Sequence, residues 1–276
     1  SGGSLSGVSV TNLGAVELVS GASVSQLSNT TFGSGTNLEV GPGAVLSGYS
    51  VGVGPILDVL SGGLTSATTV TTSGTESVFA GGTALGSVVG DGGCMQVGVP
   101  SSSQGLGGSA GGTVSNTSVS GGQLSVNSGG LAVSTTIVNN GGAQVTSGGT
   151  VSGTTISNSG GMTVLSGGTA ADTAVLSGGY FQLGVGPISG SPGSAGGSAT
   201  GTILSGGFEA VFSGGVDSGA TILLHGNQVV SAGGFSIGAA VSSGGVENVS
   251  SGGQTFNTTA FGGGVLNVSA GATAPD

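Results

Sequence analysis

The sequence predicts an all-β chain, a right-handed parallel β-solenoid of about nineteen residues per rung that runs as one domain over residues 1–276. Three observations predict it. Two ladders of apolar residues share one period, short β-branched runs alternate with Gly-rich corners, and Gly makes up 66 of 276 residues while only 4% are charged. The positive mean hydropathy of +0.44 favours an ordered chain with a thin apolar core over a disordered Gly-rich one.

The two ladders give the period directly. The first consists of Leu13, Phe32, Val51, Val70, Val89, Val119, Ile137, Ile156, Val175, Ile203, Ile222, Val241 and Ala260. The second consists of Val40, Val59, Val78, Val97, Val126, Val145, Val164, Leu183, Val211, Val230, Val249 and Val268. Most steps are close to nineteen residues, and the thirteen first-ladder positions predict about 13 rungs. Stacked rungs, spaced by about 4.8 Å, would place like residues above like inside the solenoid.

The segments between ladder positions suit strands and corners. Residues 135–149 read Thr-Thr-Ile-Val-Asn-Asn-Gly-Gly-Ala-Gln-Val-Thr-Ser-Gly-Gly. β-Branched residues favour strands, and Gly supplies the positive φ of tight corners. The period is broken twice, which predicts inserted Gly/Ser/Pro loops near 98–112 and 184–198, projecting from the same side.

Composition excludes several classes of function. The formal net charge is −10 and there is no Lys or Arg, so we expect no binding to nucleic acid or to anionic membrane surfaces. No apolar stretch reaches the roughly 18 residues of a membrane-spanning helix, so we expect no membrane insertion of this segment. Cys94 is the only cysteine, and the opening Ser1-Gly2-Gly3 lies inside the repetitive composition. We therefore expect a mature segment or an excised fragment without a disulfide framework.

The repeat resembles a known family. Its pattern Thr-x-Val/Ile, Gly-Gly, x-x-Val, Ser-Gly-Gly is similar to the passenger repeats of self-associating autotransporter adhesins, the AIDA adhesin and antigen 43 group. The resemblance is strongest over residues 113–183 and 201–272 and looser over 1–112. It implies a β-helical passenger, export across the outer membrane, and cell–cell aggregation or adhesion at an extracellular or bacterial cell-surface location.

The chemistry-bearing residues predict no catalytic, metal or cofactor site. The ten acids are interpreted as solvated side chains that stand mostly on separate rungs, although Glu209 and Glu247 share one repeat position with Gln228 between them. His225 is the only histidine and is expected at a surface corner, and Cys94 is expected to pack as a small apolar residue. Asp91-Gly92-Gly93 is interpreted as an isolated turn. A carbohydrate-acting β-helix enzyme is kept only as a remote alternative.

An outward hydroxyl row is the one surface feature that stands out. The residue before each first-ladder position should face out, and from Phe32 on nine of the twelve such residues carry a hydroxyl. We call six of its threonines the hydroxyl stripe: Thr69, Thr136, Thr155, Thr202, Thr221 and Thr259. A second outward row, which precedes the second ladder, begins with Glu39 and Asp58. The stripe has three interpretations: plain β-propensity, a self-association face, or an ice-binding array.

The leading hypothesis is an extracellular structural adhesin that mediates self-association, cell aggregation or biofilm formation. The alternative is a subunit of an extracellular filament or matrix that assembles end to end through exposed strand edges. The expected partner is a second copy of the chain, in lateral or end-to-end contact, and surface glycans are a further candidate partner.

Overall fold

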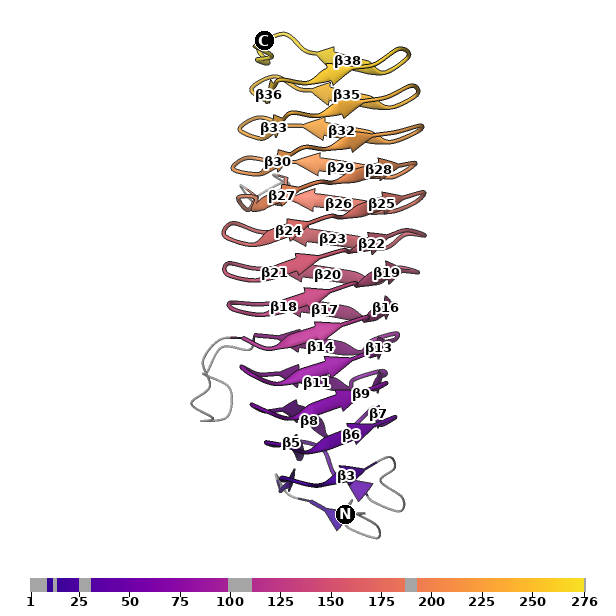
Figure 1. The fold of residues 1–276 in the computed structure, drawn as a ribbon, viewed down its shortest axis with the longest axis vertical. Coiled ribbons are helices and arrows are strands. Elements are labelled where there is room, and N and C mark those ends of the chain that lie inside the picture. The colour runs from indigo at the N-terminus through magenta and orange to yellow at the C-terminus, as the bar shows by residue number, and fades with distance from the viewer. Residues whose placement is uncertain (1–8, 12–13, 25–30, 99–110, 187–192, 276) are drawn as a thin grey trace. The chain divides into compact units, whose positions relative to one another are not determined.

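The computed structural model describes residues 9–11, 14–24, 31–98, 111–186 and 193–275, and all regular elements among them are β-strands (Figure 1). The chain is a parallel β-solenoid of about 12 turns with about 19 residues in each, close to the 13 rungs that the ladders predict. The described residues include no helix with the length and apolarity to cross a membrane. The turns divide into two compact units, residues 1–135 and 136–276. A single domain over residues 1–276 stays a prediction.

In unit 1 the turns contribute strands to three parallel sheets, named here sheets I, II and III. Sheet I contains β2 (Ala15–Leu18), β5 (Asn37–Val40), β8 (Ile56–Val59), β11 (Thr75–Val78), β14 (Cys94–Val97) and β17 (Gln123–Val126). Sheet II contains β3 (Ser23–Val24), β6 (Val45–Ser47), β9 (Leu64–Ser66), β12 (Thr83–Leu85), β15 (Thr113–Ser115) and β18 (Leu131–Val133). Sheet III contains β7 (Ser50–Val51), β10 (Thr69–Val70), β13 (Val88–Val89) and β16 (Ser118–Ser120), while β1 (Ser9–Val10) pairs with β4 (Thr31–Phe32).

Unit 2 repeats the three sheets. Sheet I contains β20 (Gly142–Val145), β23 (Gly161–Val164), β26 (Tyr180–Leu183), β29 (Phe208–Val211), β32 (Asn227–Val230), β35 (Val246–Val249) and β38 (Val265–Val268). Sheet II contains β21 (Thr150–Ser152), β24 (Thr169–Ala171), β27 (Ser198–Thr200), β30 (Val216–Ser218), β33 (Phe235–Ile237) and β36 (Gln254–Phe256). Sheet III contains β19 (Thr136–Val138), β22 (Thr155–Ile156), β25 (Ala174–Leu176), β28 (Ile203–Ser205), β31 (Thr221–Ile222), β34 (Ala240–Val241) and β37 (Thr259–Ala260).

The register explains the period of the ladders. Val59, Val78 and Val97 are register partners on adjacent strands of sheet I, nineteen residues apart. Side chains alternate between the two faces of a strand, so the second and fourth residues of most sheet I strands face the interior. The second ladder consists of the fourth residues of these strands. From Val51 on, the first ladder supplies the interior residues of sheet III, with the exception of Ile203.

Both ladders are buried along most of their length, as predicted. Val145 and Ile156 have 0% exposure. Ile203, Ala260 and Val268 are exposed, Phe32 is half-buried, and Leu13 lies outside the described residues. Ala260 and Val268 belong to the last described turn, where no further described turn lies over them.

Paired glycines form the corners after sheet I for two different reasons. Gly62 has φ of +74°, a left-handed conformation that a side chain disfavours. Gly63 follows it, and a Cβ there would lie 2.0 Å from the Val40 carbonyl oxygen of the turn below. The second glycine therefore permits close backbone stacking between turns.

Both breaks in the period fall in the same connection, between a sheet I strand and the following sheet II strand. In unit 1 the connection joins β14 to β15, and in unit 2 it joins β26 to β27. Of the two predicted loops, 99–110 and 187–192 lie outside the described residues. The base of the second is closed by backbone hydrogen bonds of 2.9 and 3.0 Å between Val185 and Ser194.

Candidate functional site: outward rows and interior acids

The hydroxyl stripe lies mostly where the sequence predicts. In unit 2 Thr136 and Thr259 are exposed, and Thr155 and Thr221 are half-exposed on the outer face of sheet III. In unit 1 Thr69 is half-exposed at the same strand position. The row is discontinuous, because Val88 follows Thr69 in register and Ala174 follows Thr155. The structure therefore gives short hydroxyl runs separated by apolar positions.

The assignment of Thr202 to the outward hydroxyl stripe is wrong. It has 0% exposure, and its Oγ1 donates a hydrogen bond to Asp217 Oδ1 at 3.1 Å. The register pairs Ala174 with Ile203 and Val175 with Leu204, so Leu204 is the interior residue and Ile203 the outward one. Ile203 and Leu204 are adjacent apolar residues, so the sequence alone does not tell which of them faces the interior. The first ladder passes through Leu204 and not through Ile203. A one-residue shift moves each side chain to the opposite face.

A column of interior hydroxyls was not predicted. Thr68, Ser87 and Thr117 in unit 1, and Thr154 and Thr173 in unit 2, follow the corner before sheet III and point inward. Their hydroxyl oxygens are buried and make no hydrogen bond in the structure. Thr202 occupies the same corner position, which is why it is buried.

The interior of unit 1 holds one glutamate among hydroxyls. Glu76 on β11 has 0% exposure, and Thr65 Oγ1 on β9 donates a hydrogen bond of 2.7 Å to its Oε1. Its Oε2 has no hydrogen-bond partner. Burial raises the pKa of Glu76 to about 7, although the hydrogen bond from Thr65 opposes the shift. The carboxyl is therefore substantially protonated near neutral pH.

The outer face of sheet I in unit 1 carries a column of acids. Glu17 pairs with Glu39, and Glu39 pairs with Asp58. Asp58 is only 2% exposed and accepts a hydrogen bond of 3.1 Å from Asn37 Nδ2. Burial, and then the charge of Glu39, raises the pKa of Asp58 to about 7. Burial, and then the charge of Glu17, raises the pKa of Glu39 as well.

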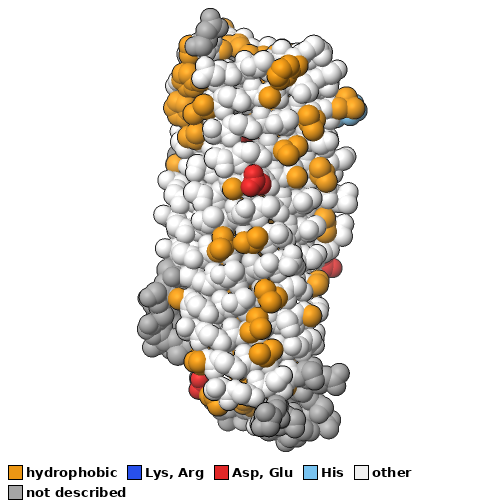
Figure 2. Space-filling model, viewed as in Figure 1, with side chains coloured by type: hydrophobic (Ala, Val, Ile, Leu, Met, Phe, Trp, Pro, Cys, Tyr) orange, Lys and Arg blue, Asp and Glu red, His pale blue; other side chains and the backbone are white. Residues whose placement is uncertain are grey.

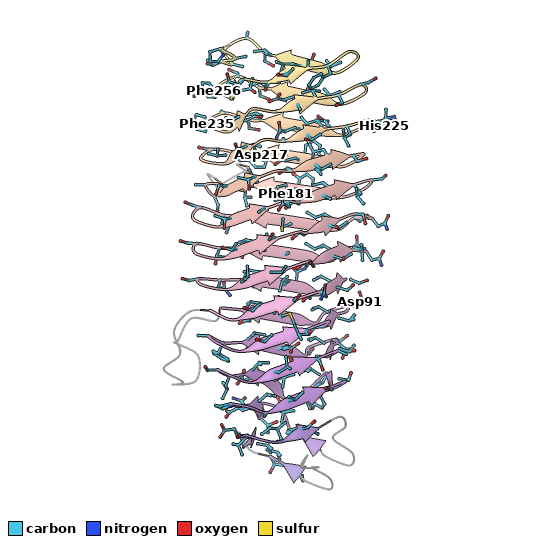
Figure 3. The ribbon with its side chains drawn as sticks, in the orientation of Figure 1. Asp91, Phe181, Asp217, His225, Phe235 and Phe256 are labelled. Carbon is cyan, nitrogen blue, oxygen red and sulfur yellow. The ribbon has the colours of Figure 1, made fainter. Side chains whose placement is uncertain are left out.

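The interior of unit 2 holds a connected polar cluster. Gln228 Nε2 donates hydrogen bonds to Glu209 Oε2 at 2.9 Å and to Asp217 Oδ2 at 2.8 Å. Ser236 Oγ donates to Gln228 Oε1 at 3.2 Å. All four side chains have 0% exposure, and Asp217 is labelled in Figure 3. One amide thus bridges two buried carboxyls from different sheets.

The two carboxyls titrate as an interacting pair. Burial, and then the charge of Asp217, raises the pKa of Glu209 well above its ordinary range. Burial raises the pKa of Asp217 to about 6, and hydrogen bonds from Glu209 and Thr202 oppose that shift. Glu209 is therefore the member of the pair that keeps its proton to the higher pH. Glu247, one strand beyond Gln228, is also fully buried, and its Oε1 accepts a hydrogen bond of 2.8 Å from Thr255 Oγ1.

These carboxyls overturn the interpretation of the acids as solvated side chains. Five of the ten are buried: Asp58, Glu76, Glu209, Asp217 and Glu247. The sequence contained the signal for three of them, because Glu76, Glu209 and Glu247 precede Val78, Val211 and Val249 by two residues. A residue two positions from an interior residue on the same strand faces inward too. The described residues contain no group of three or more His, Cys, Asp or Glu side chains placed to hold a metal ion.

The remaining single candidates lie on the surface. His225 is exposed at a corner, as predicted, with φ of +60° (Figure 3). Asp91 lies in an exposed turn, also as predicted. Cys94 is a correction: it is half-exposed at the outward first position of β14, beside Gln96 Nε2 at 3.9 Å, and does not pack in the interior.

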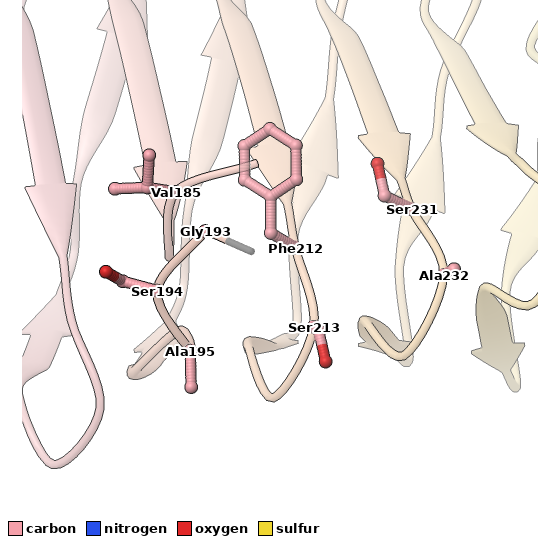
Figure 4. Close-up of a pocket in the computed structure, with 8 residues that line it drawn as sticks. All are labelled: Val185, Gly193, Ser194, Ala195, Phe212, Ser213, Ser231 and Ala232. Atoms are coloured by element: carbon pink, nitrogen blue, oxygen red, sulfur yellow. The ribbon is translucent and has the colours of Figure 1, made fainter. Parts of the chain in front are cut away.

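A pocket of about 400 Å³ lies in unit 2 where the base of the second loop meets two corners (Figure 4). Its described lining is Val185, Gly193, Ser194, Ala195, Phe212, Ser213, Ser231 and Ala232. The ring of Phe212 packs closely on Gly186, where a Cβ would lie 2.6 Å from Cε1. These lining residues include no acid, histidine or cysteine, so they supply no general acid or base.

Comparison with known proteins gives an informative likeness to a solved structure. No family model and no curated protein matches the chain. A solved structure of a TibC-catalysed hyper-glycosylated TibA fragment is 26% identical, with a TM-score of 0.72, over 99% of this chain and 99% of that one. A Dettilon tailspike protein is 11% identical over 97% of this chain and 60% of that one, with a TM-score of 0.33.

The TibA fragment is the passenger of an AIDA-like autotransporter adhesin. The chain therefore resembles self-associating adhesin passengers in fold and along nearly its whole length, as the repeat predicts. It is an adhesin-like β-helix, and the likeness favours a structural role and a location at the cell surface or outside the cell.

Proposed function

We propose that this chain is an extracellular structural adhesin whose uncharged outer faces bind a second copy of the chain, which leads to cell aggregation or biofilm formation. The observation that carries the proposal is the outer face of sheet III in each unit. It presents hydroxyl runs and apolar side chains on a parallel sheet, and Thr136 and Thr155 in one such run are register partners.

Burial of acids lowers the electrostatic barrier to such contact. The formal charge of −10 overstates the surface charge, because Glu76 and Glu209 are buried and their raised pKa values keep part of their carboxyl groups protonated near neutral pH. Glu17, Asp91 and Asp172 are exposed. Figure 2 shows one face on which red acidic side chains are few and orange hydrophobic ones are scattered among uncharged polar ones. Two such faces can approach with little repulsion.

The contact must rely on many weak interactions. The chain has no Lys or Arg, so copies cannot form salt bridges apart from those of His225 and the chain terminus. An exposed hydrogen bond contributes only about 1 kcal/mol. A repeated face can supply several such bonds together with apolar burial, whereas an isolated patch cannot. This favours lateral contact along the sheet.

Glycans are the second class of partner in this proposal. The similar TibA fragment is hyper-glycosylated, which supports a role for sugars at this kind of surface. Nothing in the described pocket lining favours catalysis on them. The proposed role is therefore structural.

The test is a pair of matched charge variants. Thr136→Asp with Thr155→Asp places two acids on sheet III of unit 2, and Ser147→Asp with Ser166→Asp places two acids, also nineteen residues apart, on exposed corners. We expect the first pair to abolish association in light scattering and the second to leave it nearly unchanged. Equal effects, or a native chain that stays monomeric at all concentrations, would refute the proposed face. Circular dichroism melts confirm that both variants fold.

A further inference from the structure

The outer face of sheet I in unit 2 has an unusual order of side chains. The first residues of β20, β23, β26 and β29 are register partners and face outward. They are two glycines followed by two aromatic residues: Gly142, Gly161, Tyr180 and Phe208. The rings of Tyr180 and Phe208 stack with centroids 5.2 Å apart and planes inclined by 6°. Phe208 thus covers one face of the Tyr180 ring.

The other face of Tyr180 is directed toward the strand that carries Gly161, where no side chain projects. Tyr180 is 38% exposed. Gly142 and Gly161 leave an open surface beside Tyr180, called here the gap. It is about 10 Å wide at the usual strand spacing. This width accommodates one sugar ring.

The backbone does not require glycine at position 161. Its φ is not left-handed, and an added Cβ would meet only the Tyr180 carbonyl oxygen, at 3.9 Å. The preceding Gly160 is different, because a Cβ there would lie 2.2 Å from the Ile137 carbonyl oxygen. Glycine inside a strand weakens it and often marks a place where a ligand approaches the backbone closely. Gly161 is therefore a glycine that the fold does not explain.

Amide and hydroxyl groups border the gap. Gln144, Thr163 and Gln182 are the third residues of β20, β23 and β26 and form the neighbouring outward row. Thr163 Oγ1 donates to Gln182 Oε1 at 3.3 Å, and Gln182 Nε2 donates to the Tyr180 hydroxyl. These bonds fix the Tyr180 ring, while the Gln144 amide is exposed.

We propose that this surface binds a neutral saccharide unit, with the apolar C–H face of one sugar ring lying over Gly161 against Tyr180. The sugar hydroxyls would bond to Gln144 and Thr163. No outward residue of β20, β23, β26 or β29 is charged, so the surface offers nothing that would select a phosphorylated, sulfated or acidic sugar. The site is separate from the sheet III face, and it stands whether or not the chain self-associates.

Saturation-transfer NMR with lactose, maltose, cellobiose, chitobiose and sialyllactose as probes tests the site on the full chain. We expect saturation transfer to at least one of the four neutral sugars, with affinity reduced about tenfold or more in Tyr180→Ala and in Gly161→Leu. Gly161→Leu fills the gap without removing any contact of the fold. Thr75→Leu, at the outward first position of β11 in unit 1, is the matched control and should bind normally.

The outcomes are distinct. No saturation transfer to any neutral sugar, full binding by Gly161→Leu, or transfer to sialyllactose alone would overturn the proposal. Light scattering of Tyr180→Ala separates this site from the proposed function, because the sheet III face is intact and association should persist.

Discussion

The two units place carboxyl groups in the same kind of interior but stabilise them differently. Glu76 in unit 1 is a single acid that accepts a hydrogen bond from Thr65. In unit 2 the Gln228 amide joins Glu209 to Asp217, and the pKa of Glu209 is raised well above its ordinary range. The comparison shows that a solenoid interior accepts a carboxyl where another sheet supplies a donor. It also shows that protonation lowers the cost of burial in both units.

The largest expected effect comes from placing an acid where no donor exists. Val145→Asp introduces a carboxyl at an interior position of unit 2 lined by apolar ladder residues. We expect a loss of about 4 kcal/mol or more in the free energy of unfolding, or failure to fold. Gln144→Asp on the exposed neighbour should change stability by less than about 0.5 kcal/mol. Equal urea midpoints for the two variants would contradict the inward assignment of the ladder.

The second effect is a decline of stability with rising pH. The folded state raises the pKa of Glu76 from 4.5 to about 7 and that of Asp217 from 3.8 to about 6, so it binds more protons than the unfolded chain between these values. The stability due to these protons is fully present below about pH 4 and is lost as pH rises through 6 to 7. Across this pH range each of the two groups lowers the free energy of unfolding by about 3 kcal/mol.

Urea unfolding at a series of pH values from 4 to 8 measures this decline. Glu76→Gln should remove the part of the pH dependence that is due to Glu76 while preserving the hydrogen bond from Thr65. Glu209→Gln should reduce the part of the pH dependence that is due to the acids of unit 2. The interior acids are wrongly assigned if stability stays constant or increases between pH 4.5 and 7.

The third effect contrasts the donors directly. Gln228→Leu removes the amide that serves both Glu209 and Asp217, whereas Thr65→Val removes one hydroxyl from Glu76. An unsatisfied buried acceptor costs about 1–3 kcal/mol, so we expect the Gln228 variant to lose about twice as much stability. Thermal melts monitored by circular dichroism report the difference. A smaller loss for Gln228→Leu than for Thr65→Val would mean that the bridge is unimportant.

The sequence predicted the fold through the residues that repeat, and the errors concern single residues that depart from the repeat. Val145 and Ile156 identify their ladders because a nineteen-residue step recurs with one chemistry, and no global information is needed. Ile203 was misplaced because Ile203 and Leu204 are both apolar, and only strand register distinguishes them. The inward orientation of Glu76 follows from its two-residue spacing to Val78, but the charge of a glutamate favours a surface position, and this led to the wrong assignment.

Other features require three-dimensional contacts. The donor to Glu209 comes from the next turn and the acid beside it comes from another sheet, so sequence spacing cannot pair Glu209 with Gln228 and Asp217. The burial of Asp58 is equally invisible, because its strand position faces outward. The gap beside Tyr180 needed both the register and the space around Gly161.

The central claim, self-association through uncharged faces, is tested most directly by light scattering of the native chain at fixed neutral pH as salt is increased. Salt screens the repulsion among exposed acids such as Glu17 and Asp172 and leaves the buried carboxyls largely unaffected. The account predicts that the mean particle mass rises between about 0.01 and 0.15 M salt, as the Debye length falls from about 30 to 8 Å. Dissociation of the assemblies on adding salt would show that charge attraction holds them together and would contradict the account.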